Sequence, residues 1–262
     1  MELNNKIAVV YGGGGALGST AAEAFAAAGA RVYLAGRTES KLAAVAERIR
    51  QAGGFAATAV VDALDTSAVD KHLSEVISRE GKVDISFNAI GVYHVQGIPL
   101  AELTPEEFEL PVVTYARGNF ITSTAAARVM SPRRAGVLFT LTTPGSKMPT
   151  SVSGGFSVSN ATVESLSIQL AGELAPQGIR VICLRPDAIP ETTRMGSHAK
   201  EVFGFRAKLM GKTLDELFTE KPPGGRHSSL EDVGNAAVFF ASEKAGAITG
   251  VVVNLSCGSV LG

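Results

Sequence analysis

Ile7-Ala-Val-Val-Tyr-Gly-Gly-Gly-Gly-Ala-Leu-Gly18 is the stretch that decides the fold of this 262-residue chain. It opens with an apolar run that indicates a buried strand, and the alanine-rich segment Ala16 to Ala28 indicates the helix that follows. The glycines allow a tight turn, and the N–H groups and positive dipole end of the helix favour a bound phosphate. Gly13 to Gly18 also satisfies the GxGxxG pattern in the strand–turn–helix context that this pattern requires. We predict a phosphate-binding turn, with a tight turn that holds no ligand as the alternative.

The same alternation of apolar strands and helical periods runs through the rest of the chain. For example, Thr104-Pro105-Glu106-Glu107 is a capping box with proline at the first helical position, which marks the start of a helix. Strict alternation implies right-handed βαβ units and a parallel sheet covered on both faces. We therefore predict one α/β domain over residues 1–262, a Rossmann-type doubly wound parallel sheet of about seven strands with helices on both faces. The expected strands are Ile7–Val10, Arg31–Ala35, Ala57–Val61, Val83–Asn88, Val137–Thr142, Ile179–Arg185 and Val251–Leu255.

The composition excludes several classes of function. Lys and Arg total 24 and Asp and Glu total 25, so the formal charge of −1 leaves no basic excess for nucleic acid or an anionic membrane. The four histidines show no metal-ligand spacing, and Cys183 and Cys257 lie on apolar runs typical of small core residues. We therefore expect no metal site and no disulfide. No signal-peptide pattern opens the chain and its apolar stretches are too short to span a membrane, which favours the cytoplasm.

One long irregular insertion separates the last two strands. It spans about residues 187–226, is rich in proline and glycine, and contains a short helical patch near Ala199 to Leu217. Such an insertion in a compact domain is usually a functional lid. Its apolar side chains favour a cover over an apolar or bulky substrate, with a core or subunit contact as the alternative. These side chains are Phe203, Phe205, Leu209, Met210, Leu214, Leu217 and Phe218.

The end of the second strand indicates which dinucleotide the turn would hold. An acidic residue at this position accepts a hydrogen bond from the 2′-hydroxyl of NAD, whereas this chain has Gly36 and Arg37. A guanidinium group suits a 2′-phosphate. The sequence therefore favours NADP(H) over NAD(H), and the alternative is that Arg37 faces solvent beside Glu39.

The order and spacing of these motifs resemble the short-chain dehydrogenase/reductase family over essentially the whole chain. The family's glycine turn is similar to Tyr11 to Gly18, its adenine-contacting Asp resembles Asp62, and its Asn-Asn-Ala-Gly resembles Asn88-Ala-Ile-Gly91. Pro186-Asp187 is similar to the family's Pro-Gly after the sixth strand. The resemblance implies a small-molecule substrate and a homo-oligomer, dimer or tetramer, built through the helices around 105–130 and 155–175. It also implies a nicotinamide dinucleotide held by Gly12, Gly14, Gly15, Leu17, Gly18, Arg37, Asp62, Ala63, Asn88, Gly91, Asn160, Pro186 and Ile189.

The departures from the family pattern are concentrated at the active site. The family's Asn, Ser, Tyr and Lys fall at Tyr115, Thr143, Phe156 and Asn160. In the family, the tyrosine donates a proton as hydride arrives, and the lysine lowers the phenol's pKa and binds the ribose. Phe156 cannot donate a proton, and Asn160 offers the ribose a hydrogen bond without charge. Thr143 keeps a hydroxyl that can polarise a substrate oxygen.

Three outcomes of these replacements stay open. In the first, the protein transfers hydride with another acid. Tyr115 is our candidate for that acid, with a purely packing role as its alternative; Tyr93 and His94 are weaker candidates, and we expect His94 in a surface loop. In the second, the substrate needs little acid help, as for an activated alkene or a protonated imine. In the third, the protein has given up redox chemistry.

These outcomes lead to one prediction and one alternative. We predict an NADP(H)-dependent oxidoreductase with a non-standard active site, which transfers hydride to a carbonyl, an imine or an activated alkene. The alternative is a catalytically inactive NADPH-binding sensor or scaffold of the same fold. By the resemblance, Asp187 and Glu191 would lie near the nicotinamide amide as acid or base, or they serve only to cap a helix or face solvent.

Overall fold

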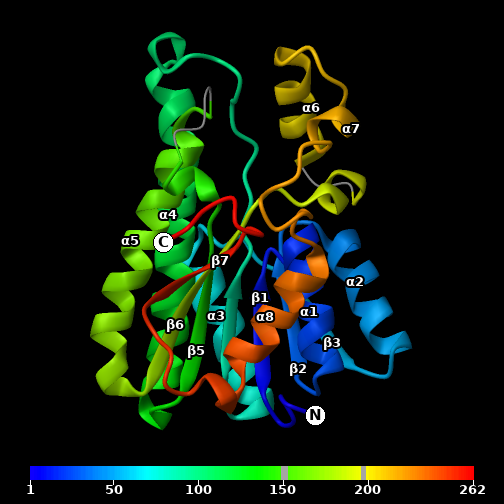
Figure 1. Cartoon of the computed structure of the whole chain (residues 1–262). Coiled ribbons are helices and arrows are strands. Elements are labelled where there is room, and N and C mark those ends of the chain that lie inside the picture. Colours follow the sequence, from blue (N-terminus) through cyan, green and yellow to red (C-terminus); the bar gives the residue numbers. More distant parts are fainter. Residues whose placement is uncertain (149–152, 196–198) are drawn as a thin grey trace.

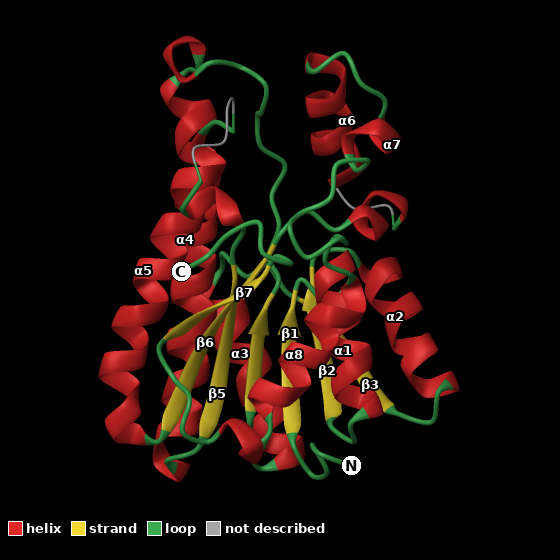
Figure 2. Cartoon of the chain, in the orientation of Figure 1, coloured by secondary structure: helices red, strands yellow, loops and turns green. Residues whose placement is uncertain are grey.

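The computed structural model describes residues 1–148, 153–195 and 199–262, which contain one seven-stranded sheet. Its strands are β1 (Ile7–Tyr11), β2 (Arg31–Gly36), β3 (Phe55–Val60), β4 (Ile85–Asn88), β5 (Gly136–Leu141), β6 (Ile179–Pro186) and β7 (Val251–Leu255). Their order is β3-β2-β1-β4-β5-β6-β7, and each neighbouring pair is parallel. Figures 1 and 2 show this sheet between two layers of helices. The predicted fold class is confirmed.

Two apolar clusters explain why helices cover both faces of the sheet. Side chains of β1 alternate between the faces, so Ala8 and Val10 join one cluster, whereas Ile7 and Val9 join the other. Burial on both faces stabilises the central strands, because each side chain leaves water for an apolar layer. The first cluster packs against α1 (Ala16–Ala27), α2 (Glu39–Gln51) and α8 (Leu230–Ala241), and the second against α3 (Thr66–Glu80), α4 (Pro105–Met130) and α5 (Gly155–Leu174).

The strand order reverses at β1. The chain builds from β1 to β2 and β3 on one side, and then from β4 to β7 on the other. In open α/β sheets, ligands bind outside the carboxyl ends of the strands at such a reversal. Figure 1 shows α6 (Ala199–Leu209) and α7 (Leu214–Leu217), which belong to the predicted insertion, beyond this edge of the sheet.

Local capping signals start and end helices where the sequence indicates. Thr104 and Glu107 make both hydrogen bonds of the capping box at α4, with Pro105 as the first helical residue. The side chain of Asp65 caps α3, which ends at Gly81 in the left-handed conformation with φ of 73°. Short 3-10 helices in the described residues are Leu100–Glu102, Ser131–Arg133, Pro144–Ser146, Ala175–Gln177, Pro190–Arg194 and Glu243–Ala245.

Strand bounds and the burial of one cysteine differ from the sequence expectation; β4, for example, begins at Ile85 rather than Val83. Strand β3 begins at Phe55 rather than Ala57, because its parallel ladder with β2 already starts at the pair Arg31 and Phe55. Cys183 is fully buried as predicted, but Cys257 is only partly buried, because the chain has left β7 and turns there with φ of 49°. Both cysteines are free thiols. Within the described ranges, no helix combines the length and apolar character needed to cross a membrane.

Candidate active site

The glycine turn after β1 requires glycine for steric reasons. A Cβ on Gly18 would lie 2.2 Å from the carbonyl oxygen of Gly12, and one on Gly12 would lie 2.3 Å from that of Ala89. Gly12 also adopts a φ of 72°, which favours glycine. Gly15 is the N-cap of α1 and offers no side chain to its first N–H groups. The first N–H groups of α1 therefore donate no hydrogen bond to a capping side chain.

The remaining residues expected around a dinucleotide lie at the same edge of the sheet. Arg37 follows β2 and is exposed, and Asp62 is exposed after β3, where its Oδ1 accepts a hydrogen bond of 3.0 Å from the N–H of Leu64. Asn88 is buried at the end of β4 and donates a hydrogen bond of 2.7 Å to Oγ1 of Thr122. The described chain places the other expected residues in the turn after β1 (Gly14), in the first turn of α1 (Leu17), after β3 and β4 (Ala63, Gly91) and at or after the end of β6 (Pro186, Ile189).

The side-chain amide of Asn160 hydrogen-bonds the backbone of Thr143 and of Phe156. Its Oδ1 accepts a hydrogen bond of 2.8 Å from the N–H of Thr143, and its Nδ2 donates one of 2.6 Å to the carbonyl of Phe156. Its side chain is buried. The amide thus joins the first turn of α5 to the segment that follows β5, and both of its polar atoms are engaged with the backbone.

Phe156 lies between two other aromatic rings. The imidazole of His94 stacks on it with 4.3 Å between ring centroids and 9° between planes, and Tyr115 meets its edge at 5.8 Å. The expectation that His94 lies in a surface loop is wrong, because its side chain is 3% exposed. The reason is the ring of Phe156, whose face offers a stacking partner for the imidazole. Tyr93, in contrast, is exposed.

The hydrogen bonds of His94 define its protonation. Nδ1 lies 2.9 Å from the carbonyl oxygen of Val92, which can only accept, so Nδ1 carries the hydrogen. Nε2 lies 2.9 Å from Nε2 of Gln96, whose amide hydrogen it accepts. We assign the neutral Nδ1–H tautomer from this pattern. Both ring nitrogens are thereby engaged in the loop that follows β4.

Tyr115 is the second titratable side chain of this cluster, beside His94. Burial raises the pKa of its phenol to about 12, and a backbone hydrogen bond at Val92 offsets part of that rise. The side chain reaches the cluster from α4, and the carbonyl of Tyr115 accepts a hydrogen bond of 2.9 Å from Nδ2 of Asn119. Tyr115, Phe156 and His94 therefore form one packed group, and Tyr115 contributes its phenol.

The acids at the start of the insertion support the structural alternative. Oδ1 of Asp187 accepts a hydrogen bond of 2.7 Å from the N–H of Ala188, and Oδ2 accepts one of 2.5 Å from the hydroxyl of Ser259. Glu191 is exposed in a 3-10 helix. Asp187 thus closes the turn after β6 against the loop after β7.

The insertion lies directly on the loop that carries His94. A Cβ on Gly97 would lie 2.0 Å from the ring of Phe205 and 2.5 Å from Cδ1 of Leu209, so these two side chains of α6 pack directly against Gly97. Phe203 and Phe218 pack together at 5.4 Å, whereas Phe205 and Leu209 stay about half exposed. The predicted apolar patch is therefore split between a small aromatic core and an open apolar surface.

A buried ion pair near Thr143 was missed by the sequence reasoning. Arg185 on β6 and Glu164 on α5 are 3.2 Å apart, with side chains 1% and 8% exposed. An arginine inside the apolar run Ile-Cys-Leu-Arg-Pro was the available signal, because a charge in a central strand needs a partner. Among the residues that the structure describes, no cluster of His, Cys, Asp or Glu has the arrangement of a metal site.

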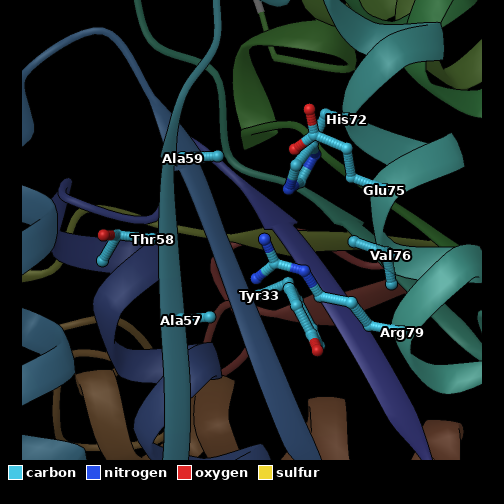
Figure 3. Close-up of a pocket in the computed structure, with 8 residues that line it drawn as sticks. All are labelled: Tyr33, Ala57, Thr58, Ala59, His72, Glu75, Val76 and Arg79. Atoms are coloured by element: carbon cyan, nitrogen blue, oxygen red, sulfur yellow. The ribbon is translucent and has the colours of Figure 1, made fainter.

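A small cavity lies away from this site, between α3 and the strands β2 and β3. Figure 3 shows side chains of Tyr33, His72, Glu75 and Arg79 around it, and its volume is about 50 Å³. Burial lowers the pKa of His72 to about 4. Among the described residues, its Nδ1 has no hydrogen-bond partner, and neither does the hydroxyl of Tyr11, whose ring meets the imidazole edge-on. The cavity thus lies beside β3, the strand at one end of the sheet, and apart from the candidate active site.

Comparison with known proteins covers almost the whole chain. Residues 14–259 match the family model described as Enoyl-(Acyl carrier protein) reductase. The chain is 27% identical to the 7alpha-hydroxysteroid dehydrogenase of Clostridium sardiniense, covering 100% of this chain and 95% of that protein. It is 28% identical to the momilactone A synthase of Oryza sativa subsp. japonica, covering 95% and 88% respectively. A crystal structure of a short-chain type dehydrogenase/reductase from Mycobacterium marinum superposes with a TM-score of 0.85 at 27% identity, covering 100% of this chain and 98% of that one.

Proposed function

The chain belongs to the short-chain dehydrogenase/reductase family of NAD(P)-dependent oxidoreductases, and on this premise we propose that it uses NADP(H) in an active site without a phenol–ammonium pair. One observation carries the proposal. Phe156 takes the position of the family's catalytic tyrosine and packs between His94 and Tyr115. Both polar atoms of the Asn160 amide are hydrogen-bonded to the backbone. A packed aromatic group of this kind preserves the shape of the site while changing its chemistry.

The preference for NADP(H) rests on the edge of the cofactor site. The open start of α1 suits the pyrophosphate, and the exposed guanidinium of Arg37 at the end of β2 suits a 2′-phosphate. Gly36, at the position of an acidic residue in NAD-binding proteins, removes the acceptor for a 2′-hydroxyl. The reduced nicotinamide, when bound, supplies a hydride.

Thr143 and Tyr115 supply the polar groups at the reacting centre. The hydroxyl of Thr143 donates a hydrogen bond to the substrate oxygen or polarises a neighbouring group. Burial raises the pKa of Tyr115 to about 12, so its phenol is protonated at neutral pH and keeps a proton to give, as a weaker acid than an exposed phenol.

The substrate we propose is an apolar electrophile. A carbonyl, an imine or an activated alkene accepts hydride, and the last two need the least acid help. The half-exposed side chains of Phe205 and Leu209 beside the His94 loop supply an apolar cover. Relatives named for a hydroxysteroid and for momilactone A, and a family model described as an enoyl reductase, support this choice.

Turnover distinguishes the enzyme from an inactive NADPH-binding sensor, which the loss of the phenol and the ammonium favours as a second candidate. Fluorescence titration detects NADPH binding in both cases. Oxidation of NADPH by a panel of apolar enones, cyclic imines and ketones is expected only of the enzyme. If NADPH binds and every substrate class leaves it unoxidised, the sensor replaces our proposal.

We also propose a homo-oligomer, a dimer or tetramer, built on the outer faces of α4 and α5. Val113 and Phe120 on α4 and Ile168 on α5 are large apolar side chains that are 53%, 55% and 52% exposed. Apolar surface on neighbouring helices of this kind favours association. Light scattering on the purified chain measures its mass, and a monomer at micromolar concentration would contradict the proposal.

A further inference from the structure

We propose that Glu164 and Arg185 are positioning residues, which hold in place the turn that carries Thr143. Glu164 lies on α5, one helical turn after Asn160. This inference rests on the proposed role of the Thr143 hydroxyl. Phe156, Asn160 and Glu164 lie four residues apart along α5, so they share one face of the helix. The family's ammonium group is absent from this face, and a buried carboxylate lies one turn further along it.

The ion pair is built into the core and is fully hydrogen-bonded. Nη1 of Arg185 lies 3.2 and 3.3 Å from the two carboxylate oxygens of Glu164. Nε donates a hydrogen bond of 2.7 Å to Oδ1 of Asn254 on β7, and Nη2 donates one of 2.7 Å to the carbonyl of Gly262. Arg185 therefore ties α5, β6, β7 and the final segment of the chain to one point.

The pair reaches Thr143 through Ser146. The hydroxyl of Ser146 donates a hydrogen bond of 2.5 Å to Oε1 of Glu164, and its N–H donates one of 3.2 Å to the carbonyl of Thr143. Thr142 donates to the same carboxylate oxygen at 3.1 Å. On the other side, Asn160 accepts the N–H of Thr143. Both backbone groups of Thr143 are thus held by contacts that lead to α5.

Stability alone is a weak reason for such a pair. Removing two charges from water is costly, and replacing a buried ion pair by apolar residues is often neutral or stabilising. A site that holds a reacting group in one geometry, however, needs neighbours whose own positions are locked. The pair meets that need, because the carboxylate of Glu164 accepts hydrogen bonds from the hydroxyls of Thr142 and Ser146, while Arg185 anchors that carboxylate to β6 and β7.

Asp84 is a matched control at the opposite end of the sheet. It is buried like Glu164, it pairs with Arg133 at 3.2 Å and Lys82 at 3.0 Å, and its Oδ2 accepts the N–H of Ile7 at 2.8 Å. It therefore holds the amino end of β1 and β4 and has no contact with the Thr143 turn. Losing its charge costs stability without disturbing the proposed function of Thr143.

The test compares the full chain, saturated with NADPH, in three forms. These are the wild type, the double variant Glu164→Leu/Arg185→Met, which keeps the core apolar and able to fold, and Asp84→Asn. Residue-resolved hydrogen exchange at the amides of Thr143 and Ser146 is the first readout. We expect both to exchange at least about tenfold faster in the double variant, with amides of β1 unchanged, and neither to change in Asp84→Asn.

Steady-state kinetics are the second readout. We expect the double variant to lose at least about tenfold in kcat, with KM and the Kd of NADPH unchanged, since only the positioned hydroxyl is affected. Unchanged protection of Thr143 and Ser146 in the double variant overturns the inference. If the wild type oxidises NADPH with no compound of the panel, the proposed function fails and hydrogen exchange alone decides this inference.

Discussion

The glycine turn after β1 and the site between β5 and α5 lie at one edge of one sheet, yet they differ in how far each departs from the family pattern. The turn keeps Gly12 and Gly18, although Ala16 replaces the family's middle glycine, because backbone atoms occupy the space that a Cβ would need at these two positions. The reactive site depends on side chains, and Phe156 replaces a phenol by a ring of the same shape. Steric contacts therefore restrict which residues the cofactor-binding turn can carry. The reactive side chains, in contrast, can be replaced as long as the new residue packs equally well.

The largest expected effect comes from a substitution that tests the steric requirement of the glycine turn. Gly18→Ala places a methyl group against the carbonyl of Gly12, so we expect the turn to shift and NADPH affinity to fall by at least about 1,000-fold. Calorimetric titration of the folded variant measures this. Gly172→Ala on α5 is the control, because its added methyl meets no atom within 4 Å and NADPH affinity is expected to stay unchanged. Normal affinity in Gly18→Ala would mean that the dinucleotide binds elsewhere.

The second prediction addresses the chemical half. Tyr115→Phe keeps the ring packed against Phe156 but removes the proposed proton donor, so we expect kcat for carbonyl reduction to fall by about 100-fold or more. NADPH affinity should stay the same. In the wild type, the phenol stays protonated well above neutral pH, because its pKa is about 12, and its titration should leave the reduction rate flat between about pH 7 and 10. A variant as fast as the wild type would remove Tyr115 from the mechanism.

The third prediction concerns the outer sheet edge, which neither half of the site uses. The pKa of His72 is about 4 in the folded protein against 6.5 for the ordinary group, so the unfolded chain takes up the proton first as pH falls. The free energy of unfolding is therefore at its full value above pH 6.5, decreases between pH 6.5 and 4, and loses about 3 kcal/mol at most. Urea unfolding at several pH values measures this. His72→Leu should lose that slope, and an equal slope in the variant would contradict the burial argument.

The smallest expected effect sharpens the assignment of the cofactor. Arg37→Ala removes a guanidinium from the proposed 2′-phosphate site, so we expect NADPH affinity to fall by about tenfold while NADH affinity stays constant. Arg48→Ala on α2 is the matched control, because Arg48 is also exposed and pairs with Glu23. Competition titrations with the two nucleotides give both constants. A loss shared equally by NADPH and NADH would assign Arg37 to a part of the cofactor common to both.

The sequence predicts the layers of this fold well and its buried contacts poorly. The alternation of apolar strands and helices predicts the seven strands, because a buried parallel strand needs an apolar run whatever its neighbours are. The burial of His94 does not follow from its own surroundings in the sequence. It depends on the face of Phe156, which lies 62 residues further along the chain and whose replacement of a tyrosine was visible.

The ion pair of Arg185 and Glu164 shows the same limit in another form. Each residue lies in an apolar element where a charge is unfavourable, yet only the packing of α5 on β6 brings the two together. The role of Asn160 also depends on tertiary structure, because its hydrogen bond to Thr143 joins a helix to a strand end. Residue types thus predict which positions carry chemistry, and the contacts between elements decide what each position does.

Calorimetric titration of the purified chain with NADPH and with NADH tests the central claim most directly. We predict one NADPH bound per chain, with a smaller Kd than for NADH, because the glycine turn receives the pyrophosphate and Arg37 the 2′-phosphate. No measurable binding of either nucleotide at millimolar concentration would contradict the account.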